Sequence, residues 1–177
     1  MFLGPLVFQS GKIMDYFNKN LKFNSKTYGK LLFSEVIDRI SIYMKEVPNA
    51  MYSFIIGTDS TASNNGGRIE YVTAVLVHRI GFGGIYFWHS IPDIGNSMYE
   101  RVFKESALSL EFSEVFLHEL KKRDMHNFSF EIHVDVGNNG KTREIITQVV
   151  GMIKGNGYKV VTKPYSYVAS KVADRHT

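Results

Sequence analysis

Two aspartates stand where strand-like runs of this sequence end. Asp59 closes the run SFIIGTD, and Asp135 closes the run FEIHVD. The carboxyl ends of strands are where α/β sheets usually carry functional side chains. A single aspartate in such a place is as often a turn former or a helix cap. A pair on separate strands instead indicates a shared acidic site.

A third carboxylate falls on a helical pattern. Between residues 96 and 124, apolar and small side chains recur every three or four positions, which predicts a long amphipathic helix. Glu105 lies on this core-facing stripe, where a carboxylate is costly unless it is protonated, paired or bound to a metal. Pairing with a buried arginine or lysine is the alternative for Glu105. Glu111 lies nearer the outer face of the helix and is a weaker candidate.

The fourth acid lies close to the carboxyl terminus. Asp174 follows Ser170 by four positions in the run YVASKVADRH, so the two share one face of a predicted helix. The small side chains of Ala169 and Ala173 allow this helix to lie close to a sheet. Asp174 could then reach the strand ends that carry the two aspartates.

Clustered carboxylates repel one another and need a counter-charge. Mg²⁺ or Mn²⁺ supplies it, because these ions prefer hard oxygen ligands. Two such ions can stabilise both the attacking water and the leaving oxygen when a phosphodiester bond is hydrolysed. The predicted catalytic and metal-binding residues are Asp59, Glu105, Asp135 and Asp174. A cation or hydroxyl near such a site can hold a phosphate, and the predicted substrate contacts are Lys163, Ser170 and Lys171.

The elements that position these residues follow from periodicity and from breakers. A helix is predicted over residues 34–47, with Ser34 as its cap and Pro48 after its end. Runs rich in β-branched and aromatic residues predict strands, at residues 51–59, 69–80, 84–91, 128–136 and 158–163. Further helical patterns occupy residues 96–124, 142–155 and 166–176.

The order of these elements is β-β-β-α-β-α-β-α behind one extra N-terminal helix. Short spacing between the first three strands favours antiparallel hairpins, and the two later crossovers favour parallel strands. We therefore predict an α/β fold with a five-stranded mixed sheet that is flanked by helices on both faces. Residues 1–27 are predicted to form an N-terminal arm, and residues 28–177 a single domain. The same order of elements occurs in the ribonuclease H-like fold.

The composition is that of an ordinary folded protein, with 44% hydrophobic and 21% charged residues. No apolar run is long enough to span a membrane. The apolar opening MFLGPLVF has neither a basic leader nor a cleavage site after it, and we interpret it as a structural segment or a contact between copies of the chain. The absence of cysteine excludes disulfides and cysteine nucleophiles and favours a cytoplasmic location.

Positive charge is concentrated near the carboxyl terminus. From Lys154 onward there are five lysines and arginines against one acid, a balance of +4 that equals the net charge of the whole chain. Tyr158, Tyr165 and Tyr167 are interleaved with these cations. Such a segment is typical of surfaces that bind RNA or DNA, although an ordinary solvated face has the same composition. We expect nucleic acid as the partner.

The run HVDVGNNGKTR contains the tripeptide Gly-Lys-Thr of phosphate-binding loops. A P-loop needs four residues between its first glycine and that tripeptide, and only two separate Gly137 from Gly140. Actin-like and sugar-kinase ATPases carry a comparable Asp-x-Gly loop, but they close two such domains around ATP, and 177 residues hold one. We interpret Asn139 and Gly140 as a turn, with Thr142 at the start of the next helix. Nucleotide binding at this loop is the weakest alternative.

From about Tyr28 onward the chain resembles the YkuK-like ribonuclease H-like proteins of bacteria. The matching stretches are IIGTDS, ESALSLE, HVDVGNNGKT, GMIKGNGY and KPYSYVASKVAD. The resemblance implies a ribonuclease H-like fold and a metal-dependent nuclease site at Asp59, Asp135 and Asp174. The helix member of that site would be Glu105 or, in the same stretch, Glu111. Thr61 stands where the family pattern leads us to expect glutamine, a departure that removes no carboxylate.

The leading hypothesis is a Mg²⁺- or Mn²⁺-dependent nuclease that acts on RNA, DNA or their hybrid. The alternative is a nucleic-acid-binding or adaptor domain that keeps the fold without catalysis. Metal binding at the four acids separates the two hypotheses, because only the nuclease requires it.

Overall fold

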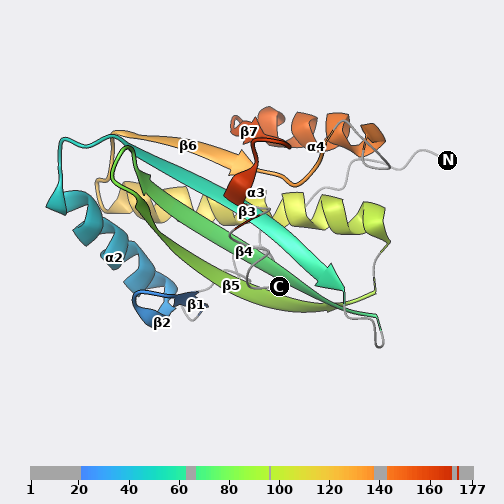
Figure 1. Ribbon diagram of the computed structural model, residues 1–177, viewed down its shortest axis with the longest axis horizontal. Coiled ribbons are helices and arrows are strands. Elements are labelled where there is room, and N and C mark those ends of the chain that lie inside the picture. Colours follow the sequence, from blue (N-terminus) through green and yellow to red (C-terminus); the bar gives the residue numbers. More distant parts are fainter. Residues whose placement is uncertain (1–20, 63–66, 96, 138–142, 169–170, 172–177) are drawn as a thin grey trace.

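The computed structural model describes residues 21–62, 67–95, 97–137, 143–168 and 171 (Figure 1). Within these ranges a seven-stranded sheet has the strand order β2-β1-β5-β4-β3-β6-β7. The strands are β1 (Lys22–Ser25), β2 (Gly29–Leu32), β3 (Tyr52–Ala62), β4 (Arg68–Arg79), β5 (Gly84–Ile94), β6 (Phe128–His133) and β7 (Lys159–Val161). The helices are α2 (Phe33–Glu46), α3 (Met98–Lys122) and α4 (Arg143–Gly155).

The sheet changes from antiparallel to parallel at β3. This strand pairs with β4 in antiparallel register over its whole length, and β4 pairs in the same way with β5. On its other side β3 runs parallel to β6, and β6 runs parallel to β7. The helices α3 and α4 provide the two crossovers that parallel neighbours require. The predicted α/β fold with a mixed sheet is therefore present.

The prediction of five strands was wrong, because the hairpin of β1 and β2 extends the sheet. Strand β1 pairs along its length with β2, and Asn24 pairs with Trp88 of β5. The sequence there is rich in lysine and asparagine and shows no strand pattern. Phe23 supplies the missing hydrophobic anchor, because its ring lies 5.7 Å from that of Phe33 and 5.5 Å from that of Phe112. Residues 22–25 of the predicted arm thus belong to the sheet, whereas residues 1–20 lie outside the described ranges, so this part of the arm and its proposed contact between copies stay predictions.

Three helices cover one face of the sheet, and in Figure 1 α3 runs behind the strands. One core cluster joins α2 and α3 to side chains such as Phe54 and Val75. A second joins α3 and α4 to Ile132 and Val134. The opposite face holds a smaller cluster of Ile55, Val72, Ala74 and Val168. The predicted cover of this face by the last helix falls mostly on residues 169–170 and 172–177, outside the described ranges.

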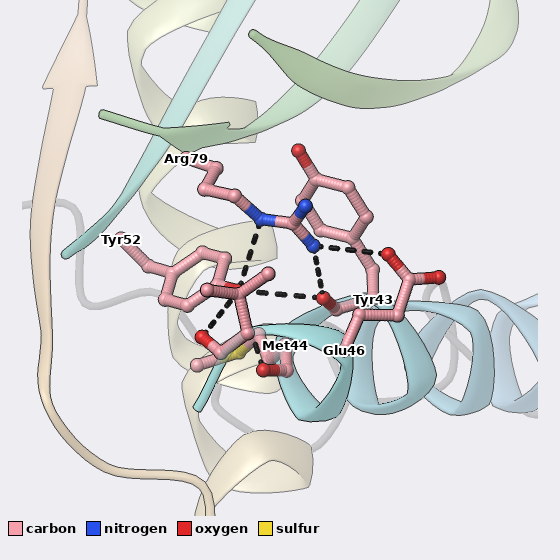
Figure 2. Close-up of polar contacts among 6 residues, drawn as sticks. Tyr43, Met44, Glu46, Tyr52 and Arg79 are labelled. Atoms are coloured by element: carbon pink, nitrogen blue, oxygen red, sulfur yellow. Dashed lines mark hydrogen bonds and ion pairs between the residues drawn. The ribbon is translucent and has the colours of Figure 1, made fainter. Parts of the chain in front are cut away.

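The end of α2 is tied to the start of β3 and the end of β4 (Figure 2). The hydroxyl of Tyr52 lies 3.1–3.3 Å from the carbonyl oxygens of Tyr43, Met44 and Val47, at the carboxyl-terminal end of the helix. The Nε of Arg79 donates to the same hydroxyl at 3.1 Å, and its Nη2 donates to the carbonyl of Tyr43. The guanidinium also lies 4.0 Å from the centre of the Tyr43 ring.

The beginning of α2 differs from the prediction by one or two residues. Leu32, rather than Ser34, is the N-cap, and its amide donates to the carboxylate of Glu35 at 2.6 Å. Helix ends are the least certain part of any periodicity argument, because the first turn has no repeat to mark it. As for membranes, none of the helices in the described ranges combines the length and the apolar character that a bilayer crossing needs.

The cluster in Figure 2 makes a prediction about stability. Tyr52→Phe removes the hydroxyl whose one hydrogen lies within reach of three carbonyls at the end of α2 and whose oxygen accepts from Arg79. We expect the free energy of unfolding in urea to fall by about 1 kcal/mol, the usual net value of such a bond. Tyr165→Phe is the matched control, because Tyr165 is 76% exposed and its hydroxyl should add little. Equal unfolding midpoints for Tyr52→Phe and the control would contradict the assignment.

Candidate functional site

The two predicted strand-end aspartates occupy aligned positions on neighbouring parallel strands. The last paired residues of β3 and β6 are Gly57 and His133. Asp59 and Asp135 each follow two residues later, Asp59 within β3 and Asp135 just beyond the end of β6. Side chains two apart in extended chain lie on one face, which is the face opposite α3. The structure thus places both carboxylates at one end and on one face of the sheet.

Glu105 reaches the same strand end from the other face. Its Oε1 accepts a hydrogen bond of 2.6 Å from the hydroxyl of Ser60, the residue after Asp59. Side chains alternate along a strand, so Ser60 points toward α3 and Asp59 points away from it. The carboxylate of Glu105 therefore approaches the two aspartates around the end of β3.

Serines allow α3 to lie close to β3 and so to deliver Glu105. Ser106, Ser109 and Ser113 are at most 1% exposed and occupy the helix face toward the sheet. The hydroxyl of Ser109 donates to Thr58 of β3 at 2.9 Å. The other two donate to carbonyls one turn earlier in their own helix, at 2.8 and 2.6 Å. These bonds satisfy buried hydroxyls that would otherwise be costly.

Burial raises the pKa of Glu105 to about 8. The hydrogen bond from Ser60 and the charge of Arg101 lower this pKa, whereas the charges of Asp59 and Asp135 raise it further. Glu105 is therefore mostly protonated at neutral pH. Glu111 has a raised pKa as well, but its causes are burial and Glu114, partly offset by Lys104. Of the two helix candidates, Glu105 is the one that interacts with both aspartates.

Arg101 and Ser60 are site residues that the sequence analysis missed. Arg101 lies one turn before Glu105 on α3, its Nε donates to the hydroxyl of Ser60 at 3.0 Å, and its Nη2 donates to the carbonyl of Ser60. The four-residue spacing of Arg101 and Glu105 was a usable signal, because residues at that spacing share a helix face. The role of Ser60 had no signal beyond its place after Asp59.

Lys163 is bound to Asp135 rather than standing alone. Its Nζ lies 3.0 Å from Oδ2 of Asp135, and the two side chains are 51% and 22% exposed. A Cβ added to Gly137 would lie 3.3 Å from the Cβ of Lys163, so glycine permits this close approach. The second oxygen of Asp135, Oδ1, is buried and has no hydrogen-bond partner among the described residues.

The remaining predicted residues lie mostly outside the described ranges. Asp174 and Ser170 are not described, so their roles stay predictions. Lys171 is described and exposed, with no further contact that bears on its role. The structure thus brings together Asp59, Glu105, Asp135 and Lys163 from four parts of the chain.

The side chains of this site are of the types that bind a divalent cation, but the described residues do not surround a position where a cation could bind. A buried carboxylate oxygen without a partner and a carboxyl group with a raised pKa both favour an added positive charge. Within the described ranges, however, no three acidic or histidine side chains are arranged to hold a metal ion. Glu105 is turned toward Ser60, and Asp174 lies outside those ranges.

Comparison with known proteins identifies the family. The sequence profile described as "Ribonuclease H-like" matches residues 35–177. The chain belongs to the ribonuclease H-like family. This ribonuclease H-like chain is similar to the uncharacterized protein YkuK of Bacillus subtilis (strain 168), with 28% identity over 167 residues that cover 88% of this chain and 96% of YkuK.

Two solved structures show more distant likeness to this ribonuclease H-like chain. One is the N-terminal RNase H domain of Rv2228c from Mycobacterium tuberculosis, solved as a fusion with maltose-binding protein. It is 12% identical, the match covers 70% of this chain and 91% of that chain, and the TM-score is 0.31. The other is NurA, with 16% identity, coverage of 60% and 29%, and a TM-score of 0.30. At these TM-scores it is the family match that identifies the fold.

The raised pKa of Glu105 predicts a pH-dependent stability. The folded protein holds the proton up to about pH 8, whereas the unfolded chain releases it near its ordinary pKa of 4.5. Stability therefore falls as the pH rises through this window, by at most about 1.4 kcal/mol per pH unit. Glu105→Gln removes this dependence, so we expect its melting temperature to match the wild type near pH 5 and to exceed it at pH 8.

The matched control for this measurement is Glu70→Gln, because Glu70 is an exposed acid of β4 that is not among the causes of the pKa shift of Glu105 or Glu111. It should follow the wild type at every pH. A difference between Glu105→Gln and the wild type that stays constant from pH 5 to pH 8 would show that Glu105 does not titrate in this window.

Proposed function

We propose that this protein is a nuclease that depends on Mg²⁺ or Mn²⁺ and hydrolyses phosphodiester bonds of RNA, DNA or an RNA–DNA hybrid. The observation that carries the proposal is the alignment of Asp59 and Asp135 on parallel strands, with Glu105 close enough for both to raise its pKa. Membership of the ribonuclease H-like family supports it.

Asp59 and Asp135 would hold the cations, and Glu105 would join them when its carboxylate leaves the hydroxyl of Ser60. Asp174 is the fourth proposed ligand. Divalent ions at such a site activate a water molecule and stabilise the leaving oxygen of the phosphodiester. Each of these side chains offers only oxygen, the ligand type that Mg²⁺ and Mn²⁺ prefer.

Arg101 and Ser60 would control the carboxylate of Glu105. The guanidinium donates to the serine hydroxyl, which donates in turn to Glu105. This chain of bonds keeps the acid turned toward Ser60. A carboxyl group held by a single hydroxyl can change its rotamer at low cost.

The loop after β7 would contact the substrate. Lys163 carries a partly exposed cation beside Asp135, and Tyr165, two residues later, is 76% exposed. A cation can bind a phosphate oxygen and an exposed aromatic ring can stack on a base. Lys171 is an exposed cation further along the same segment. Nucleic acid is therefore the proposed partner.

A second candidate is a nucleic-acid-binding or adaptor domain without catalysis. The ion pair of Lys163 with Asp135 favours it, because a lysine already supplies the counter-charge that a metal would bring. It also agrees with the lack of a three-ligand arrangement within the described part of the chain.

The decisive experiment is cleavage of end-labelled RNA, DNA and hybrid oligonucleotides with Mg²⁺, with Mn²⁺ and with a chelator. We expect cleavage only with metal. Asp59→Asn and Asp135→Asn should each lower the rate by about a hundredfold or more, the loss seen when a preorganised electrostatic group is removed. Asp38→Asn is the matched control, since Asp38 is an exposed acid on α2 that pairs with Arg123.

Metal binding distinguishes the two candidates independently of the substrate. For the nuclease, Mn²⁺ should raise the melting temperature of the wild type and of Asp38→Asn, and have less effect on Asp59→Asn and Asp135→Asn. For the adaptor domain, Mn²⁺ should change none of the four while oligonucleotides still bind. Cleavage that survives in both Asp59→Asn and Asp135→Asn would refute the proposed nuclease site.

A further inference from the structure

A buried histidine lies between the acidic site and the carboxyl-terminal segment. His133 is 1% exposed and ends β6, two residues before Asp135. It faces the side of the sheet that carries both aspartates, since side chains two apart share a face. The carboxyl-terminal segment contacts the sheet on this same face through Val168. His133 is thus placed between two parts of the proposed site.

Both ring nitrogens of His133 have partners, and these partners specify its protonation. The amide of Val168 donates to Nδ1 at 3.3 Å, so Nδ1 must carry a lone pair. The hydrogen of the neutral ring is then on Nε2, which donates to Oε1 of Glu131 at 2.9 Å. Lys159 binds the other carboxylate oxygen of Glu131 at 2.8 Å and orients it. The ring is therefore neutral and in one tautomer.

The segment packs against the histidine as well as bonding to it. The ring of Tyr167 lies 4.9 Å from the imidazole in an edge-to-face arrangement with an angle of 86°. Val168 is fully buried against Ile55, Val72 and Ala74. Tyr167 and Val168 have helical backbone, and an amide in the first turn of a helix has no partner within that helix. His133 supplies this partner from the sheet.

We propose that His133 is a positioning residue that anchors, at Val168, the carboxyl-terminal segment that carries the proposed ligand Asp174. Asp174 follows Val168 by six residues in the run that the sequence predicts to be helical. Glu131 acts through His133, since its carboxylate selects the tautomer that leaves Nδ1 free to accept.

The consequence for Asp174 depends on the proposed nuclease function, but the anchor itself can be tested without it. Hydrogen exchange measured by mass spectrometry reports on the peptide that spans residues 165–177. In His133→Phe, which keeps a ring of similar size but neither hydrogen bond, we expect exchange in this peptide to accelerate about tenfold or more, with β3 unchanged. His133→Gln keeps one donor and one acceptor and should restore most of the protection.

The matched control is His89→Phe. His89 is also 1% exposed in the same sheet, but it lies on the other face, edge-on to the rings of Phe23 and Phe112. This variant should leave exchange of the 165–177 peptide at the wild-type rate. Unchanged exchange in His133→Phe would overturn the anchor. So would equal acceleration in His89→Phe, or a His133→Gln variant as unprotected as His133→Phe.

The link to Asp174 is tested by a double-mutant cycle on cleavage rates. His133→Phe should lower kcat by up to about a hundredfold, the effect of a misplaced group, while KM changes less. In the Asp174→Asn background the same change should add little, because the group it positions is already gone. Equal fold losses in the two backgrounds would overturn the positioning role. If no variant or wild type cleaves any oligonucleotide, the proposed function fails, and the exchange comparison still decides whether the anchor exists.

Discussion

The parallel pairing of β3 with β6 is the constraint on which the proposed site depends. Parallel strands point the same way, so their carboxyl ends meet at one edge of the sheet. The last matched pair of the two strands, Gly57 and His133, precedes Asp59 and Asp135 by two residues, so both aspartates lie at this edge. Parallel neighbours also require a long crossover, and α3 is that crossover. Helix α3 follows β5, which is antiparallel to β4 and therefore ends at the same edge of the sheet as β3. The helix starts at that edge, and this brings Glu105 close to the end of β3.

This arrangement puts a carboxyl group into an unfavourable place. The buried serines of α3 let the helix lie close to β3, and the nearness of the helix removes water from Glu105. Desolvation and the two aspartates oppose ionisation of Glu105, while Ser60 and Arg101 only partly compensate. A site with a raised pKa and a buried carboxylate oxygen without a described partner is less stable than a neutral core would be. Such an arrangement is often found where a ligand must be bound.

The two ends of β3 differ in how many contacts hold their polar side chains. At its start, Tyr52 and Arg79 tie the strands β3 and β4 to the end of α2 through several hydrogen bonds and an aromatic contact (Figure 2). At its other end, the polar side chains are held by fewer and more replaceable partners, such as the hydroxyl of Ser60 and the cation of Lys163.

The sequence by itself determined the strongly periodic elements and the acids that end them. The long amphipathic pattern of α3, the strand runs of β3 to β5 and the positions of Asp59 and Asp135 depend on local residue spacing, which is visible without a structure. The hairpin of β1 and β2 was not visible, because its polar residues form strands only when Phe23 packs against distant rings. Only the tertiary structure decided that α2, α3 and α4 share one face, that Ser60 and Lys163 bind acids, and that Arg101 binds Ser60. These contacts join residues far apart in the chain, and no local pattern encodes the geometry that brings such residues within hydrogen-bond distance.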